Sequence, residues 1–122
     1  MTTLTEGKTP GDWLMFEEDS RYSRDLKTIA SGAKYSSGTV LGEISANEKL
    51  TACDPAAADG SEVAVAILLN DVDASAADVQ AVVITSHARV RRLGLTFAEG
   101  ISNQAQRDAA MAQLSARGIK QI

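Results

Sequence analysis

The sequence has one cysteine, Cys53, and one histidine, His87. A lone cysteine excludes a disulfide within the chain and a metal site built from several cysteines. A histidine-based metal site would need carboxylate partners, and the spacing of the acidic residues identifies none. No apolar run approaches the ~20 residues that cross a bilayer, and the start of the chain lacks the charged-then-apolar pattern of a signal peptide. We therefore expect a product that is made and used without secretion and has no membrane partner.

Aromatic residues and basic charge are also scarce. Tryptophan, tyrosine and phenylalanine together number five in 122 residues, and 16 acidic residues outnumber 12 basic ones, for a net charge of −4. Binding to nucleic acid needs a basic surface, so this balance argues against DNA or RNA as a partner. A chain of this length is expected to form one domain that buries roughly two-thirds of its unfolded surface.

The first 25 residues differ from the rest in charge and in aromatic content. They hold six acidic and three basic residues, a net charge of −3, and three of the five aromatic residues. A segment rich in glycine, threonine and acids does not usually fold alone, yet the run from Trp13 to Phe16 is costly to expose to water. Two interpretations stay open. Either these residues fold back and fill the core, or residues 1–25 form a flexible arm that binds a partner, which is the interpretation we favour. The binding residues of that arm would be Trp13, Leu14, Phe16 and Tyr22.

The stretch from Glu62 to Leu69 predicts the central strand of the fold. Every residue after Glu62 is apolar, and the β-branched side chains and the short length favour a strand over a helix. Strict alternation would place Val63, Val65, Ile67 and Leu69 on one face. The opposite face would then carry Ala64, Ala66 and Leu68. We expect this strand to be buried on both sides.

Three further segments predict strands, at residues 26–30, 39–44 and 81–92. Gly42, inside the second, is expected to mark a bulge or a close approach of two backbones. The third segment is the longest candidate in the chain. Its alternation predicts a buried face made of Val82, Ile84, Ala88 and Val90.

The C-terminal region changes to a helical period. Asn103 is a good N-cap, and Gln106 three residues later completes a capping box. Gly118 is the expected end of a helix near 103–117, after which residues 119–122 return to the sheet. The apolar stripe of this helix is predicted to be Ala110, Met111 and Leu114.

No group of residues has the spacing of a catalytic, cofactor or metal site. Asp71 and Asp73, with Asp78 nearby, could bind a hard cation, but the spacing lacks the third acid and the glycine of an EF-hand loop. We therefore interpret them as a solvated acidic turn. Ser61 lacks the Gly-x-Ser-x-Gly context of a nucleophile elbow. Cys53 has no basic neighbour that would lower the pKa of its thiol, which favours a small packed residue over a nucleophile.

The remaining candidates are His87 and a short basic strip. His87 is expected on the exposed face of its strand rather than as a catalytic base. The strip consists of Arg89, Arg91 and Arg92, and it fits an acidic protein contact better than a nucleic-acid site. We therefore expect no enzymatic activity and no cofactor.

Several segments resemble one known family. They are Tyr22 to Asp25, Gly38 to Gly42, Asp54 to Ala64, Ile67 to Leu69 and Asp71 to Ala74. In this order they are similar to the head decoration proteins of tailed bacteriophages, the family of the lambda head decoration protein. None is a catalytic signature, so the specificity lies in their number and order.

The resemblance implies a structural role. Members of the family are homotrimers that bind the major capsid protein on the outer surface of the expanded head and resist the pressure of the packaged DNA. The implied location is the virion, after synthesis in the cytoplasm of the bacterial host. The implied fold is a β-clip, a bent ribbon that closes into an incomplete barrel. Together with the patterns above, it predicts a mainly β domain at residues 26–122 with one C-terminal helix, preceded by the arm at residues 1–25.

Two alternatives come from other functional classes. One is an enzyme on a similar trimeric β-clip scaffold, such as the dUTPase class, but no segment matches the nucleotide-binding motifs of that class. The other is a generic oligomeric module for a small ligand or a glycan. Five aromatic residues, three of them before residue 25, are too few and badly placed for a sugar site.

Overall fold

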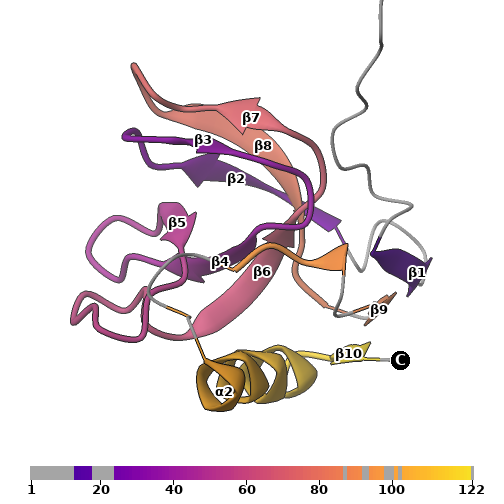
Figure 1. The fold of residues 1–122 in the computed structure, drawn as a ribbon. Coiled ribbons are helices and arrows are strands. Elements are labelled where there is room, and N and C mark those ends of the chain that lie inside the picture. The colour runs from indigo at the N-terminus through magenta and orange to yellow at the C-terminus, as the bar shows by residue number, and fades with distance from the viewer. Residues whose placement is uncertain are drawn as a thin grey trace, which may run out of the picture.

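The computed structural model describes residues 13–17, 24–86, 88–91, 94–97, 101 and 103–121, with backbone only for residues 15–17. A five-stranded barrel forms the centre of the molecule, and one helix lies beneath it (Figure 1). The barrel strands are β2 (Arg24–Ile29), β4 (Val40–Glu43), β5 (Leu50–Ala52), β6 (Ala64–Leu68) and β8 (Val79–Ile84). The prediction of a mainly β fold with one C-terminal helix is confirmed for the described residues.

The barrel is closed in the order β2-β5-β4-β6-β8, where the resemblance implies an incomplete barrel. Its neighbouring strands are antiparallel except β2 and β5, which are parallel and pair through a single residue pair, Ile29 and Leu50. One hydrogen bond beside that pair, from the Ala30 amide to the Leu50 carbonyl at 2.8 Å, completes the closure. The rest of β2 is held by β8, to which all six of its residues are paired.

Two smaller sheets flank the barrel. The first has the order β1-β9-β10 and consists of β1 (Leu14–Glu17), β9 (Ala88–Val90) and β10 (Ile119–Gln121). It brings the N-terminal and C-terminal regions together, because β9 lies between β1, which is antiparallel to it, and β10, which is parallel to it. The second is a two-stranded ribbon of β3 (Lys34–Tyr35) and β7 (Val72–Asp73).

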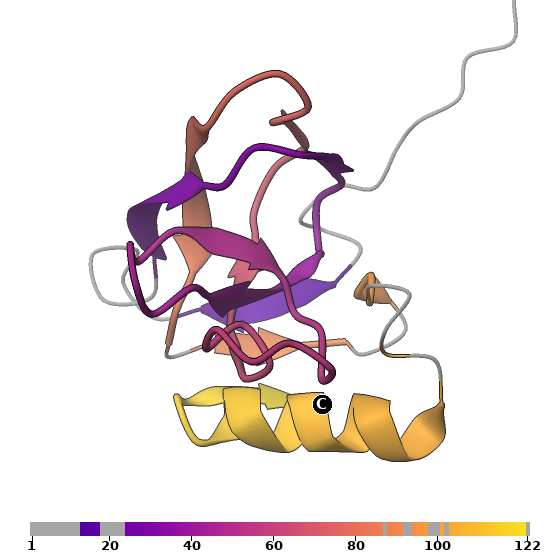
Figure 2. The same ribbon diagram turned by 90° about the vertical axis from the view of Figure 1, so that its left-hand side faces the viewer.

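The helix α2 (Gln104–Ser115) lies along the base of the barrel in both views (Figures 1 and 2). The predicted capping box is confirmed: the Gln106 amide donates to Asn103 Oδ1 at 2.9 Å, and the Asn103 amide donates to Gln106 Oε1 at 3.4 Å. Gly118 has a φ of +87° two residues beyond the C-cap Ala116, and β10 follows at once. The buried face of the helix is the predicted one: Ala110, Met111 and Leu114.

Strand β6 is buried along its whole length, as predicted, because it separates two hydrophobic clusters. The alternation that we expected along it holds from Ala66 to Leu69 but is wrong at Ala64 and Val65. Gly42 pairs with Ala64 while Leu41 pairs with Ala66, so Val65 is an extra residue that forms a bulge. As a result Val65, Ala66 and Leu68 belong to the cluster inside the barrel. The cluster between the barrel and the helix receives Ala64, Ile67 and Leu69.

The single strand predicted at residues 81–92 is wrong as well. The chain forms β8 and β9 instead, and these two strands belong to different sheets because β8 pairs with β2 and β6 whereas β9 pairs with β1 and β10. Val83 takes the interior position, and Val82 points outward with 37% of its surface exposed. The other three residues of the predicted face, Ile84, Ala88 and Val90, are buried as expected.

Candidate functional site

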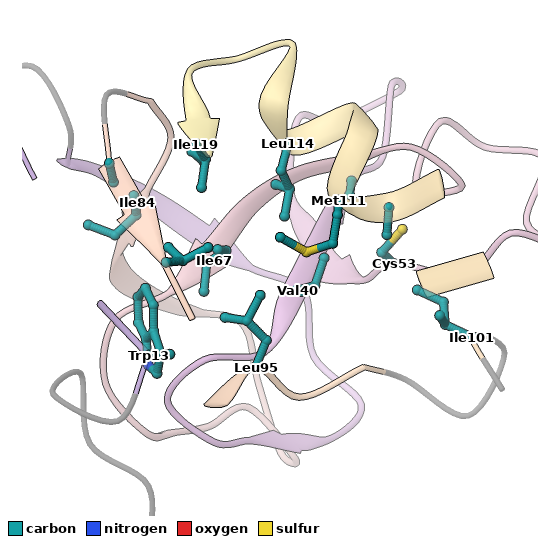
Figure 3. Packing of buried hydrophobic residues seen from close by; sticks show 14 of the residues in the cluster. Trp13, Val40, Cys53, Ile67, Ile84, Leu95, Ile101, Met111, Leu114 and Ile119 are labelled. Atoms are coloured by element: carbon teal, nitrogen blue, oxygen red, sulfur yellow. The ribbon is translucent and has the colours of Figure 1, made fainter. Parts of the chain in front are cut away.

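Trp13 fixes the place at which the N-terminal region joins the domain. Its side chain is fully buried in the cluster between the barrel and the helix, at one end of the packed side chains in Figure 3. The indole Nε1 donates a hydrogen bond to Ser37 Oγ at 3.0 Å, and the Trp13 carbonyl accepts one from the Arg91 amide at 2.7 Å. Side chain and backbone are therefore both held, which makes Trp13 an anchor for whatever precedes it.

The pocket around the indole is built by residues far away in the sequence. Ser37 Oγ donates a hydrogen bond to the Leu69 carbonyl oxygen at 2.7 Å, and the Ser37 amide donates one to Asp71 Oδ1 at 2.7 Å. Gly38 has a φ of +88°, and a Cβ at that position would lie 2.9 Å from Trp13 Cδ1. The glycine thus serves both the turn and the close approach of the ring.

The four residues predicted to bind a partner are placed as follows. Trp13 is a core residue, which is the alternative that the sequence left open. Its side chain is therefore unavailable to a partner in this structure. Leu14 is half-buried and packs against the same cluster. Phe16 pairs through its backbone with Arg89 across β1 and β9, whereas its side chain and the whole of Tyr22 lie outside the described residues. Binding by this region stays a prediction.

A hollow of about 370 Å³ opens at one end of the barrel, where charged side chains meet an apolar floor. Lys27 Nζ lies 3.9 Å from Asp25 Oδ2 and 4.0 Å from Glu43 Oε2. Arg117 and the apolar Leu50 also line the hollow. Both signs of charge are present, and such partly exposed ion pairs contribute little to stability. Thr85 and Ser86 line the hollow as well.

The acidic turns are structural, as the sequence predicts. Hydrogen bonds from Ser61 lower the pKa of Asp59, and hydrogen bonds from Ser75 lower the pKa of Asp73. The Lys49 ammonium, which bonds to Asp78, lowers the pKa of that carboxyl. Asp59 and Asp73 thus accept bonds from their own turns, whereas Asp78 accepts bonds from the distant Lys49 and from the Ser31 amide. No cluster of metal-binding residues occurs within the described ranges.

Cys53 is buried, as expected, and its thiol faces the Glu62 carbonyl oxygen at 3.7 Å. Burial away from water is the largest cause that raises the pKa of the thiol to about 11, and the carboxylates of Asp54 and Glu62 add to it. At neutral pH the group is therefore a neutral thiol, which is a poor nucleophile. His87, the other candidate for chemistry, lies outside the described residues.

The raised pKa of Cys53 predicts a pH dependence of stability. The folded state holds the thiol proton up to pH of about 11, whereas the unfolded chain releases it near the ordinary value of 9.0. The contribution of the Cys53 thiol to the free energy of unfolding is present below pH 9 and is lost as the pH rises toward 11. Between these values the folded state binds more protons than the unfolded state. The free energy of unfolding, measured with urea from pH 8 to pH 11, should fall more steeply for the wild type than for Cys53→Ala. Equal slopes would contradict a buried neutral thiol.

Three large hydrophobic residues are exposed on the described surface: Leu26 at 58%, Val63 at 42% and Val82 at 37%. Leu26 and Val82 face each other across β2 and β8, and Val63 directly precedes β6. The sequence pattern assigned Val63 and Val82 to buried faces and therefore missed this feature. The sequence did offer one signal that Leu26 is exposed, because Leu26 lies between the charged residues Asp25 and Lys27.

Comparison with protein families decides what kind of protein this is. The model of the family described as bacteriophage lambda head decoration protein D matches residues 3–119, nearly the whole chain. The chain belongs to this family. No curated protein matches the chain.

Membership in the head decoration family confirms the resemblance and indicates a virion protein of the phage head. A structural family agrees with the neutral Cys53 thiol, which is a poor nucleophile. The family also implies binding to the phage capsid. Among the helices of the described ranges, none is long and apolar enough to cross a membrane.

Proposed function

We propose that the protein is a capsid cement protein that binds the major capsid protein on the outer surface of the expanded head as a homotrimer. In that position it stabilises the head against the pressure of the packaged DNA, after synthesis in the cytoplasm of the bacterial host. The observation that carries the proposal is the family match over residues 3–119. The mainly β fold with one C-terminal helix agrees with this family, although the β2-β5-β4-β6-β8 barrel is closed rather than incomplete.

The proposed mechanism is mechanical. A cement protein that contacts several capsid subunits adds binding free energy across the joints between them, so the joints cannot part without breaking its contacts as well. A trimer strengthens this effect, because two further arms act at high effective concentration once the first arm has docked. An extended arm can also add a strand to an exposed sheet edge, where main-chain hydrogen bonds give affinity and side-chain pockets give specificity.

The N-terminal region is the proposed contact with the capsid. The sequence predicts an arm at residues 1–25, and the burial of Trp13 divides that region into two parts. Residues 1–12 precede the anchor and can span up to about 40 Å when extended. We assign the contact to this part together with Leu14, Phe16 and Tyr22, and we exclude the side chain of Trp13.

Deletion of residues 1–12 should reduce the affinity for expanded heads at least tenfold and leave thermal unfolding of the free protein unchanged. Trp13 and the described residues that it packs against remain in this variant, so these contacts of the core are kept. Co-sedimentation of the protein with purified expanded heads measures binding, and circular dichroism measures unfolding. A variant with residues 1–12 replaced by a Gly/Ser segment of equal length is the matched control for chain length, and it should bind as weakly as the deletion.

Two outcomes separate the parts of this proposal. Full binding by the deletion variant would contradict the role of the arm but not the cement function. Failure of the wild type to bind expanded heads, or heads that resist heat and chelation equally well with and without it, would contradict the cement function itself.

A further inference from the structure

The exposed hydrophobic residues form two separate sites rather than one patch. Leu26 and Val82 are directly paired across β2 and β8 and make the first site. The Leu69 amide donates to the Val82 carbonyl at 3.2 Å, so Leu69 marks the level of that site on the neighbouring strand. Val63 lies six residues before Leu69 along an extended chain, a distance of roughly 20 Å. One copy of the protein therefore cannot cover its own first site with its second.

The two sites differ in charge. On the outer face of the first, Arg24 precedes Leu26 by two residues, and alternation along β2 places both on the same side. Thr28 follows on that side and is uncharged. The second site adjoins an acidic turn, since Glu62 directly precedes Val63 and Asp59 and Asp54 lie in the same loop. From residue 50 to residue 86 the sequence contains six acidic residues and no lysine or arginine.

Two different complementary sites on one chain suit a closed ring of copies. When copies meet through unlike surfaces, the contact repeats head to tail, and it closes into a ring if the rotation between copies permits. An apolar centre with a polar rim is the usual anatomy of such a contact, and opposite charges at the rim favour the correct partner and register. A symmetric pairing of like sites would instead place Arg24 against Arg24.

We infer that Leu26 and Val82 of one copy pack against Val63 and the acidic turn at residues 54–62 of the next, and that three copies close the ring. This inference rests on the proposed homotrimer and adds to it the residues that hold the copies together. Arg24 then faces Glu62 and Asp59 of the neighbouring copy.

Cysteine cross-linking tests the inference directly. The wild type is the control, because its one cysteine is buried and should not react with a short bismaleimide. The double variant Leu26→Cys with Val63→Cys should give covalent dimers and trimers on a denaturing gel. Each single variant should stay monomeric. The pair Leu26→Cys with Ala76→Cys, which places the second thiol on an exposed turn between β7 and β8, is the matched control and should not cross-link. The reaction is run both in free solution and on expanded heads.

The outcomes are distinct. Covalent dimers from Leu26→Cys alone would show that like sites meet, which would overturn the inference. A double variant that binds heads but never cross-links would overturn it as well. Wild-type protein that fails to bind heads counts against the cement function instead. As a second measurement, Leu26→Ser and Val63→Ser should each raise the dissociation constant for self-association at least tenfold in sedimentation equilibrium, whereas Ala76→Ser should not. Unchanged association in both serine variants would also overturn the inference.

Discussion

Replacing Trp13 with alanine should lower the free energy of unfolding by about 3–5 kcal/mol, the usual cost of removing a buried tryptophan or phenylalanine side chain. The indole is fully buried and packs in the cluster between the barrel and the helix. Its loss also leaves Ser37 Oγ without the Nε1 donor. Domains of this kind have a total stability of about 5–15 kcal/mol, so the variant should be close to unfolding at physiological temperature. Urea unfolding followed by circular dichroism measures the change.

Two variants apportion that loss. Trp13→Phe keeps most of the apolar volume and should be less destabilised than Trp13→Ala. Ser37→Ala removes the hydrogen-bond acceptor of the indole and should cost about 1–3 kcal/mol, the range for a buried polar group left without a partner. Unchanged unfolding of Trp13→Ala together with lost binding to heads would instead return Trp13 to the capsid-binding arm.

Replacing Gly42 with alanine should also be severely destabilising, at a cost of about 3 kcal/mol or more, at or beyond the upper end for overpacked sites. A Cβ at this position would lie 2.2 Å from the Ser61 carbonyl oxygen and 2.7 Å from its carbonyl carbon. These are backbone atoms, so no side-chain rotation relieves the clash. Strand β4 is also fixed on both sides by β5 and β6. The yield of folded protein and its urea midpoint measure the effect.

Gly32 provides the matched control for this substitution. It has a φ of +133°, but a Cβ there would meet no atom within 4 Å. Gly32→Ala therefore tests backbone strain alone, at about 1–3 kcal/mol, whereas Gly42→Ala tests space alone. A smaller loss for Gly42→Ala than for Gly32→Ala would show that β4 and the Ser61 loop can move apart.

Local signals in the sequence predicted the elements whose partners lie nearby. The capping box joins Asn103 to Gln106 within one helical turn, so it could be read directly. The burial of β6 on both sides followed from its uninterrupted apolar composition. Gly42 was predicted as a bulge or close approach, and the bulge occurs opposite it, at Val65.

The features that could not be predicted from the sequence depend on pairing between distant segments. Residues 81–92 alternate well enough for one strand, but the partners of β8 and β9 belong to different sheets, and this forces a break between Ile84 and Ala88. Val82 and Val83 are chemically identical, so only the pairing of β8 with β2 and β6 decides which one faces inward. The position of Trp13 depended on Ser37, Gly38 and Leu69, which no local pattern connects to it.

The position of β9 between β1 and β10 sets an order of events during synthesis. The N-terminal strand β1 leaves the ribosome early, but its hydrogen-bonding partners are residues 88–90. Strand β10, on the other edge of β9, consists of residues 119–121 near the end of the sequence. Strand β1 therefore lacks its complete sheet until both residues 88–90 and residues 119–121 have been synthesised. While residues 119–121 are still missing, β9 carries β1 on one edge and nothing on the other, so completion of this sheet is a late step in folding.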